Sequence, residues 1–156
     1  MRQFWLRYRA NQTQIVPRTL TDKLQRVMNA AARIISNTRK LDHGLVHVRH
    51  DILRWLDVSD GITFRLCVQV FQCLCGMAPS YLSELCRLES EGRRQLRSSG
   101  LSQLAISCYN LATVSRRAFG YAGPKAWNSL PDYLRCSELS LETFKRHLKT
   151  FLFAHY

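Results

Sequence analysis

The chain has 156 residues, of which 23 are Lys or Arg and 11 are Asp or Glu, so its formal net charge is +12. This length fits one domain, and a hydrophobic content of 46% is enough for a core, which excludes a wholly disordered chain. The basic excess makes polyanions the natural partners, nucleic acid before an anionic membrane, although a basic solvated surface has the same composition. No uncharged apolar run is long enough to cross a bilayer, and the N-terminus lacks a secretory pattern. We therefore expect an intracellular protein of the nucleus or cytoplasm, without a transmembrane segment and not secreted.

The first predicted helix covers residues 19–36, where apolar side chains recur at steps of three and four. Its stripe consists of Leu20, Leu24, Val27, Ala31, Ile34 and Ile35. Thr19, followed by Asp22 three residues later, predicts a capping box at the start of this helix. Another face carries the basic residues Lys23, Arg26 and Arg33. These cations can lie along a phosphate backbone or simply face water.

Periodicity predicts further helices over residues 45–55, 60–75, 79–88 and 116–128. The helix over residues 60–75 is apolar around most of its circumference, so we expect it to be buried, with Ser59 or Asp60 as its cap and Gly76 at its end. Residues 104–115 are compatible with a short β-hairpin. The fold class is therefore mainly α, with about five helices.

The last predicted helix covers residues 140–154 and is amphipathic and basic. Its apolar stripe consists of Leu141, Phe144, Leu148, Phe151 and Leu152. Three cations gather on another face: Lys145, Arg146 and Lys149. Such a helix can pack on the domain while it presents cations to phosphate, lie on an anionic membrane, or dock in a partner's groove.

Cysteine and histidine patterns give little support for a metal site. Six cysteines in a reducing compartment are expected to be free thiols of the core, including Cys73 and Cys75, whose spacing points them apart on a helix. His43, His47 and His50 follow the i, i+4, i+7 spacing of one helical face, which could hold zinc but is more typical of surface histidines. No acidic or cysteine ligand motif accompanies them, so we predict neither a metal nor a cofactor.

Several short sequence segments, taken together, resemble those of a known family. They are the run from Leu24 to Arg33, Leu53 to Leu56, Ala78 to Leu82, Leu96 to Ser99, Arg116 to Phe119, Ala122 to Pro131 and Phe144 to Phe153. In this order they resemble the C-terminal region of the reverse transcriptase polyprotein of LINE-type, non-long-terminal-repeat retrotransposons. Residues 20–156 are expected to form a single helical domain that resembles the region C-terminal to the reverse transcriptase thumb. Residues 1–19 match nothing in that family and form an unmatched N-terminal extension.

The resemblance implies an origin in an RNA-directed DNA polymerase, but the residues do not support catalysis. Reverse transcriptases of this family hold metal ions with an aromatic-Ala-Asp-Asp box, and this chain contains no Asp-Asp pair. It also lacks a Gly-rich phosphate loop and the serine elbow of hydrolases. We therefore predict no enzyme activity, and we expect the polymerase domain to be missing.

The sequence thus predicts a non-catalytic fragment of a transposable element that binds RNA or single-stranded DNA without strong sequence specificity. The candidate phosphate contacts are Arg93, Arg94, Arg97, Arg116, Arg117, Lys125, Lys145, Arg146 and Lys149. Trp127 and Tyr133 are candidates for base stacking, although the apolar neighbours of Trp127 favour a place in the core. The alternative is a structural or interaction module that packed against the missing polymerase domain and has no nucleic-acid binding of its own.

Overall fold

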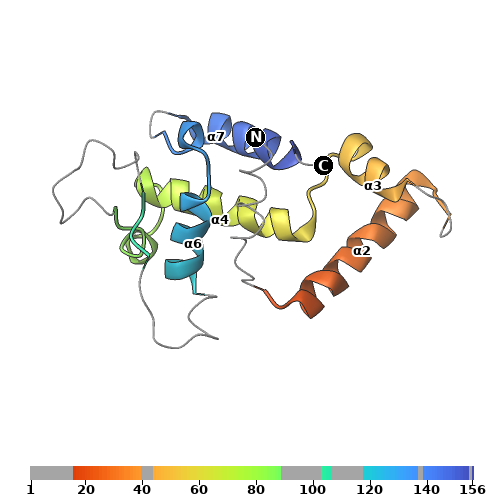
Figure 1. The fold of residues 1–156 in the computed structure, drawn as a ribbon, viewed down its shortest axis with the longest axis horizontal. Coiled ribbons are helices and arrows are strands. Elements are labelled where there is room, and N and C mark those ends of the chain that lie inside the picture. The colour runs from red at the N-terminus through yellow and green to blue at the C-terminus, as the bar shows by residue number, and fades with distance from the viewer. Residues whose placement is uncertain (1–15, 40–43, 89–102, 107–117, 137–138, 155) are drawn as a thin grey trace.

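The computed structural model describes residues 16–39, 44–88, 103–106, 118–136, 139–154 and 156, and these residues are mainly helical (Figure 1). The predicted mainly α fold class is confirmed. In chain order the elements are α2 (Arg18–Ser36), α3 (Leu45–His47), the π-helix η1 (Val48–Ile52), α4 (Val58–Leu74), α5 (Ser80–Ser83), α6 (Phe119–Asn128), the 3-10 helix η3 (Asp132–Leu134) and α7 (Leu141–Phe153).

The expected β-hairpin near residues 104–115 lies largely outside the described residues. Within the described part of the chain there is no strand, but Leu104 forms an isolated antiparallel bridge with Leu88. The side chain of Asn128 also binds Leu104, because its amide oxygen accepts from Leu104 N at 2.9 Å and its amide nitrogen donates to Leu104 O at 2.8 Å. These contacts fasten residues 103–106 to the last turn of α6.

Helix α4 occupies the centre of the molecule, with α7 running alongside it and α6 crossing it (Figure 1). Its Cys67, Val70 and Phe71 are almost completely buried, as expected for a helix that is apolar around most of its circumference. Gly123 of α6 allows a close approach here, because a Cβ at that position would lie 3.0 Å from Cγ2 of Val70. The prediction that residues 60–75 form a buried helix is confirmed.

Helix α7 packs its apolar stripe against this core. Phe144 is fully buried and stacks on Phe71, with ring centroids 4.4 Å apart and an interplanar angle of 12°. Leu148 and Leu152 are also fully buried, so of the arrangements considered for residues 140–154 the structure shows packing on the domain. This burial fixes which side of α7 faces outward.

Two of the expected helix caps are wrong. Helix α2 begins at Arg18, after Pro17, without a side-chain cap, so the capping box from Thr19 and Asp22 does not form. Helix α4 begins at Val58 rather than at Ser59 or Asp60. The side chain of its N-cap residue, Asp57, does not cap the helix, because it is engaged by residues of other elements.

The start of α7 and the end of α4 lie where the sequence pattern predicts them. Ser140 is the N-cap of α7, and its hydroxyl accepts a hydrogen bond from Thr143 N at 3.3 Å. Gly76 follows α4 with a φ of 69°, the left-handed conformation in which glycine has no steric penalty. These ends depend on neighbours in the chain, which explains why a local pattern predicts them.

The cysteines divide into buried and exposed thiols. Cys67, Cys73 and Cys86 are buried, and burial raises the pKa of Cys67 to about 12, so that thiol stays protonated at neutral pH. Cys75 and Cys136 are exposed, and the expectation that they belong to the core is wrong. For Cys75 the reason is helix geometry, since the spacing that points Cys73 and Cys75 apart leaves Cys75 on the solvent side.

We expect Phe144→Ala to lower the free energy of unfolding by about 3–5 kcal/mol, because it empties a fully buried site between aromatic rings. His147→Ala changes an exposed residue of the same helix and should cost no more than about 0.5 kcal/mol. Urea unfolding followed by circular dichroism measures both changes. Equal stabilities of the two variants would contradict the packing of α7 described above.

Candidate nucleic-acid interface

The basic side chains of α7 lie on the side of the helix that the core leaves open. Arg146 and Lys149 are exposed and three residues apart, so they are neighbours on the helix surface. Lys145 is partly covered, and its Nζ lies 2.8 Å from Oε1 of exposed Glu142. Such an exposed ion pair stabilises the helix by only about 0–1 kcal/mol, so Lys145 can exchange this partner for a phosphate at little cost.

A fourth cation, Arg54, comes from the segment between η1 and α4. Its guanidinium carbon lies 5.1 Å from the ring centroid of Phe153, and Nζ of Lys149 lies 5.8 Å from the same centroid. Both distances allow a cation–π interaction. The Phe153 ring therefore brings together Arg54 and Lys149, two exposed cations that are far apart in the sequence.

Sequence reasoning missed Arg54, because periodicity placed it inside a predicted helix over residues 45–55. The helical turns instead end at Ile52, so Arg54 lies outside them. Its backbone has a φ of 53°, in the left-handed region that is uncommon for residues other than glycine. The chain reverses beside it, since Trp55 N donates to Arg49 O at 2.8 Å. Only this tertiary arrangement brings Arg54 to the C-terminal turn of α7.

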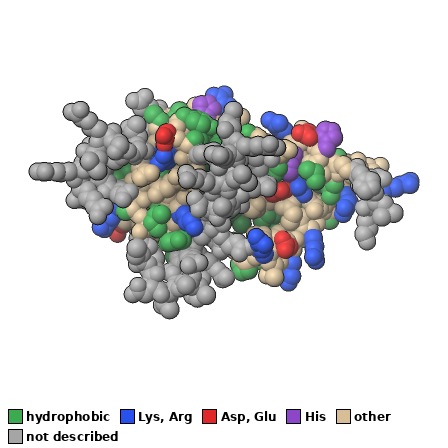
Figure 2. Space-filling model, in the orientation of Figure 1, with side chains coloured by type: hydrophobic (Ala, Val, Ile, Leu, Met, Phe, Trp, Pro, Cys, Tyr) green, Lys and Arg blue, Asp and Glu red, His purple; other side chains and the backbone are tan. Residues whose placement is uncertain are grey.

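Of the remaining candidate phosphate contacts, only Lys125 is described, and no described contact joins it to this cluster. Lys125 lies on α6, with its Nζ 5.8 Å from the ring centroid of Tyr121. Five further candidates lie outside the described residues: Arg93, Arg94, Arg97, Arg116 and Arg117. In Figure 2, Lys and Arg side chains of the described residues are visible towards both ends of the molecule.

The two aromatic candidates have different surroundings. Trp127 is 1% exposed and packs near Phe71 and Phe144, so it cannot stack on a base, and its expected place in the core is confirmed. Tyr133 follows in η3 and is 59% exposed, so it remains accessible to a partner.

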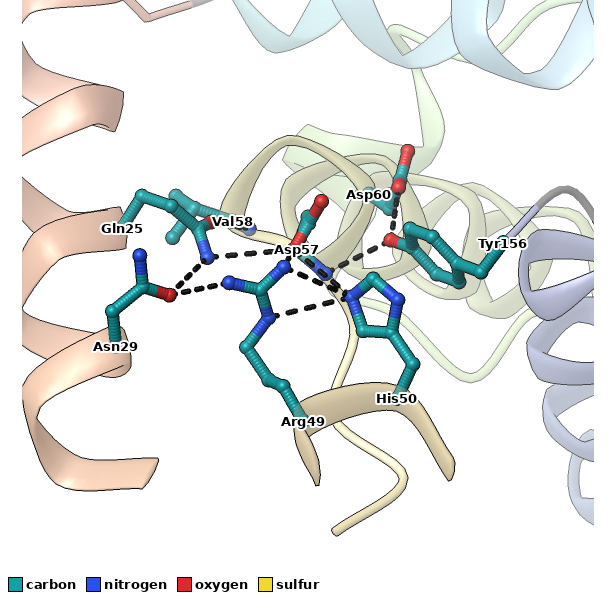
Figure 3. Close-up of polar contacts among 8 residues, drawn as sticks. All are labelled: Gln25, Asn29, Arg49, His50, Asp57, Val58, Asp60 and Tyr156. Atoms are coloured by element: carbon teal, nitrogen blue, oxygen red, sulfur yellow. Dashed lines mark hydrogen bonds and ion pairs between the residues drawn. The ribbon is translucent and has the colours of Figure 1, made fainter. Parts of the chain in front are cut away.

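A second constellation, which we call the Asp57 cluster, joins α2, η1, α4 and the C-terminal residue (Figure 3). Its members are Gln25, Asn29, Arg49, His50, Asp57, Asp60 and Tyr156. Oδ1 of Asp57 lies 2.6 Å from Arg49 Nη2, 3.2 Å from His50 Nε2 and 3.3 Å from Gln25 Nε2. Arg49 and His50 are buried, so their polar groups depend on these contacts.

The same cluster ties α2 and the C-terminus to the start of α4. Val58 N donates to Oε1 of Gln25 at 3.0 Å, and Arg49 Nη1 donates to Oδ1 of Asn29. On the other side, the hydroxyl of Tyr156 accepts from Asp57 N at 2.9 Å and donates to Oδ2 of Asp60. The rings of Tyr156 and His50 have centroids 3.6 Å apart. These interactions connect elements and account for the buried charge without invoking chemistry on a substrate.

The histidine spacing considered for zinc does not produce a common site among the described residues. His47 Nδ1 lies 2.5 Å from Asp51 Oδ2 at the surface, whereas His50 is buried beside Asp57. His43 lies outside the described residues. In the part of the chain that the structure describes, no three His, Cys, Asp or Glu side chains are grouped so that they could hold a metal ion.

Tyr156→Phe should lower the free energy of unfolding by about 1 kcal/mol at neutral pH, because buried Asp60 loses a donor. Burial, and then the hydrogen bond to Asp60, raise the pKa of Tyr156 above its ordinary value of 10.0. The unfolded tyrosine therefore releases its proton first, and this residue's contribution to stability falls as the pH rises above about 10.

The Phe variant should lack that alkaline loss, and urea unfolding at several pH values between 8 and 11 measures the difference. Tyr81→Phe is the matched control, because Tyr81 is 67% exposed. The same pH dependence in the Tyr156 and Tyr81 variants would show that the Tyr156 hydroxyl does not donate to Asp60 as described.

None of the described helices has the length and apolar character that a membrane span requires. No protein-family model matches the chain, and neither a curated protein nor a solved structure matches it.

Proposed function

We propose that this chain is a non-catalytic helical module that binds RNA or single-stranded DNA through the outer side of α7. The observation that carries the proposal is the meeting of Arg54 and Lys149 at Phe153, beside exposed Arg146. Cations from two separate segments form a local concentration of positive charge, and the net charge of +12 adds long-range attraction for a polyanion.

The chemistry of this surface favours binding to the phosphate backbone. Lys and Arg neutralise phosphates and release counterions, which supplies affinity that falls with salt and does not depend on sequence. Exposed Tyr133 offers a ring that could stack on an unpaired base, but it lies on η3, and no described contact joins it to the α7 cations. We therefore assign the binding to charge, with weak preference among sequences.

The resemblance to the C-terminal region of LINE-type reverse transcriptases supports an origin in such a retrotransposon. In that setting the module would hold the template or target strand for the reverse transcriptase domain of the parent polyprotein. The absence of an Asp-Asp pair from the sequence supports a non-catalytic role, because two-metal phosphoryl transfer depends on clustered carboxylates. The five arginines at positions 93, 94, 97, 116 and 117 remain predicted additional contacts.

The test measures binding of the full chain to single-stranded DNA and to an RNA hairpin by fluorescence anisotropy at several salt concentrations. Replacing Arg54, Arg146 and Lys149 together by Ala should flatten the slope of log K against log salt for a single strand by roughly 2 units. All three side chains are exposed, so the fold should be preserved.

The matched control replaces Arg18, Lys23 and Arg26 of α2 by Ala, which removes the same charge from another exposed surface. We expect its slope to stay within about 0.5 units of the original. Equal flattening in both variants would show that only net charge matters and would overturn the assignment to α7. No binding at low salt by a helical, monodisperse chain would instead favour the interaction module without nucleic-acid binding.

A further inference from the structure

Helix α2 contacts the rest of the molecule through its polar face. Gln25 and Asn29 bind residues of the Asp57 cluster, and Ala32, on the same side of the helix, is completely buried. The apolar stripe lies on the opposite side. Its large members are between 45% and 81% exposed: Leu20, Leu24, Val27, Ile34 and Ile35. Rotating the stripe inward would break the hydrogen bonds of Gln25 and Asn29, so the exposure follows from how α2 is attached.

The spacing of this stripe is that of a helix that pairs with another helix. Five residues of the stripe, which we call the seam, follow one another at steps of four, three, four and three residues. They are Leu20, Leu24, Val27, Ala31 and Ile34. This is the heptad repeat of a coiled-coil seam, narrower than the apolar face of an ordinary surface helix. Ala31, in the middle, leaves room for the side chain of a partner.

The charged residues beside the apolar stripe of α2 indicate which kind of partner helix it can bind. Lys23 is exposed and borders the stripe between Leu20 and Val27, and exposed Arg26 lies one row further out, next to Lys23. No described residue forms an ion pair with either cation. A partner helix with Asp or Glu along the facing edge would gain from both cations. A second copy brings the same basic edge and another net charge of +12, which opposes self-pairing.

A membrane surface fits the stripe less well than a helix does. Helices that lie in a lipid interface carry Trp, Phe or Leu on a broad apolar side, whereas the stripe of α2 follows the narrow heptad seam that is typical of helix pairing. We propose that the apolar face of α2 is the docking surface for an amphipathic helix of another protein, one that carries acidic side chains beside its own apolar stripe. This inference is independent of nucleic-acid binding, which we assign to α7.

The test uses two synthetic three-heptad peptides with Leu at the seam positions, one with Glu and one with Lys at the flanking positions. The full chain should bind the Glu peptide about tenfold more tightly than the Lys peptide in isothermal titration calorimetry. The double variant Val27→Gln, Ile34→Gln keeps every charge and should bind the Glu peptide about tenfold more weakly. Its helicity and unfolding midpoint should not change, because both residues are more than half exposed.

A charge reversal tests the edge of the stripe. Lys23→Glu combined with Arg26→Glu should remove or invert the preference for the Glu peptide. Equal binding of that peptide by the original chain and the Gln variant would assign it to general attraction to a basic protein and overturn the proposal. Absence of binding to the Glu peptide would also overturn the proposal. The same holds for self-association in sedimentation equilibrium that the Gln variant abolishes, which would indicate a second copy as the occupant. It holds equally for binding to vesicles of anionic and neutral lipids that the original chain shows and the Gln variant loses.

Discussion

The fold of this protein depends on the burial of one helix, α4, by the helices around it. Because α4 is apolar around most of its circumference, it is stable only when other elements remove several of its sides from water. Helix α6 approaches it at Gly123, and α7 covers it with Phe144 and Leu148. Burying that stripe of α7 leaves Arg146 and Lys149 on the outside. The outward cations are therefore a consequence of the core, since a helix that turns one face inward presents its opposite face to solvent.

Asp57 has a comparable influence at the other end of the molecule. Its carboxylate interacts with Arg49, His50 and Gln25, and through these side chains the polar face of α2 is directed inward. In most surface helices the apolar face is attached to the domain and the polar face is solvated. Here hydrogen bonds and a largely buried ion pair determine the orientation, and the apolar face is left outside. Buried polar groups of this kind give a specific orientation more readily than they add stability.

The sequence predicted the longer helices well because periodicity is a local property, recorded in residues three and four positions apart. It predicted two short helices too long, since α5 covers only Ser80–Ser83 of residues 79–88, and η1 ends at Ile52 instead of residue 55. It could not predict how α2 is oriented, because the hydrogen bond from Gln25 reaches Asp57, 32 positions away. The contact of Tyr156 with Asp57 spans 99 positions, and the approach of Arg54 to Phe153 is equally invisible to a local pattern. The expected cap at Ser59 or Asp60 failed for a related reason. Asp60 is bound by Tyr156, 96 positions away, and the helix begins at Val58, two residues before the first helical position that a cap at Ser59 would allow.

The side-chain amide of Asn128 restricts the conformational freedom of the chain between α5 and α6. By holding Leu104, it divides the connection between α5 and α6 into two closed loops, and each closure costs conformational entropy that the anchor must offset. The side-chain amide of Asn128 holds Leu104 as a neighbouring β-strand would. Its nitrogen donates to the carbonyl of Leu104, and its oxygen accepts from the N–H of the same residue. An aspartate at this position would keep the acceptor alone, leaving the carbonyl of an almost fully buried residue without its donor. The exchange of a single nitrogen for oxygen would thus weaken the closure of both loops.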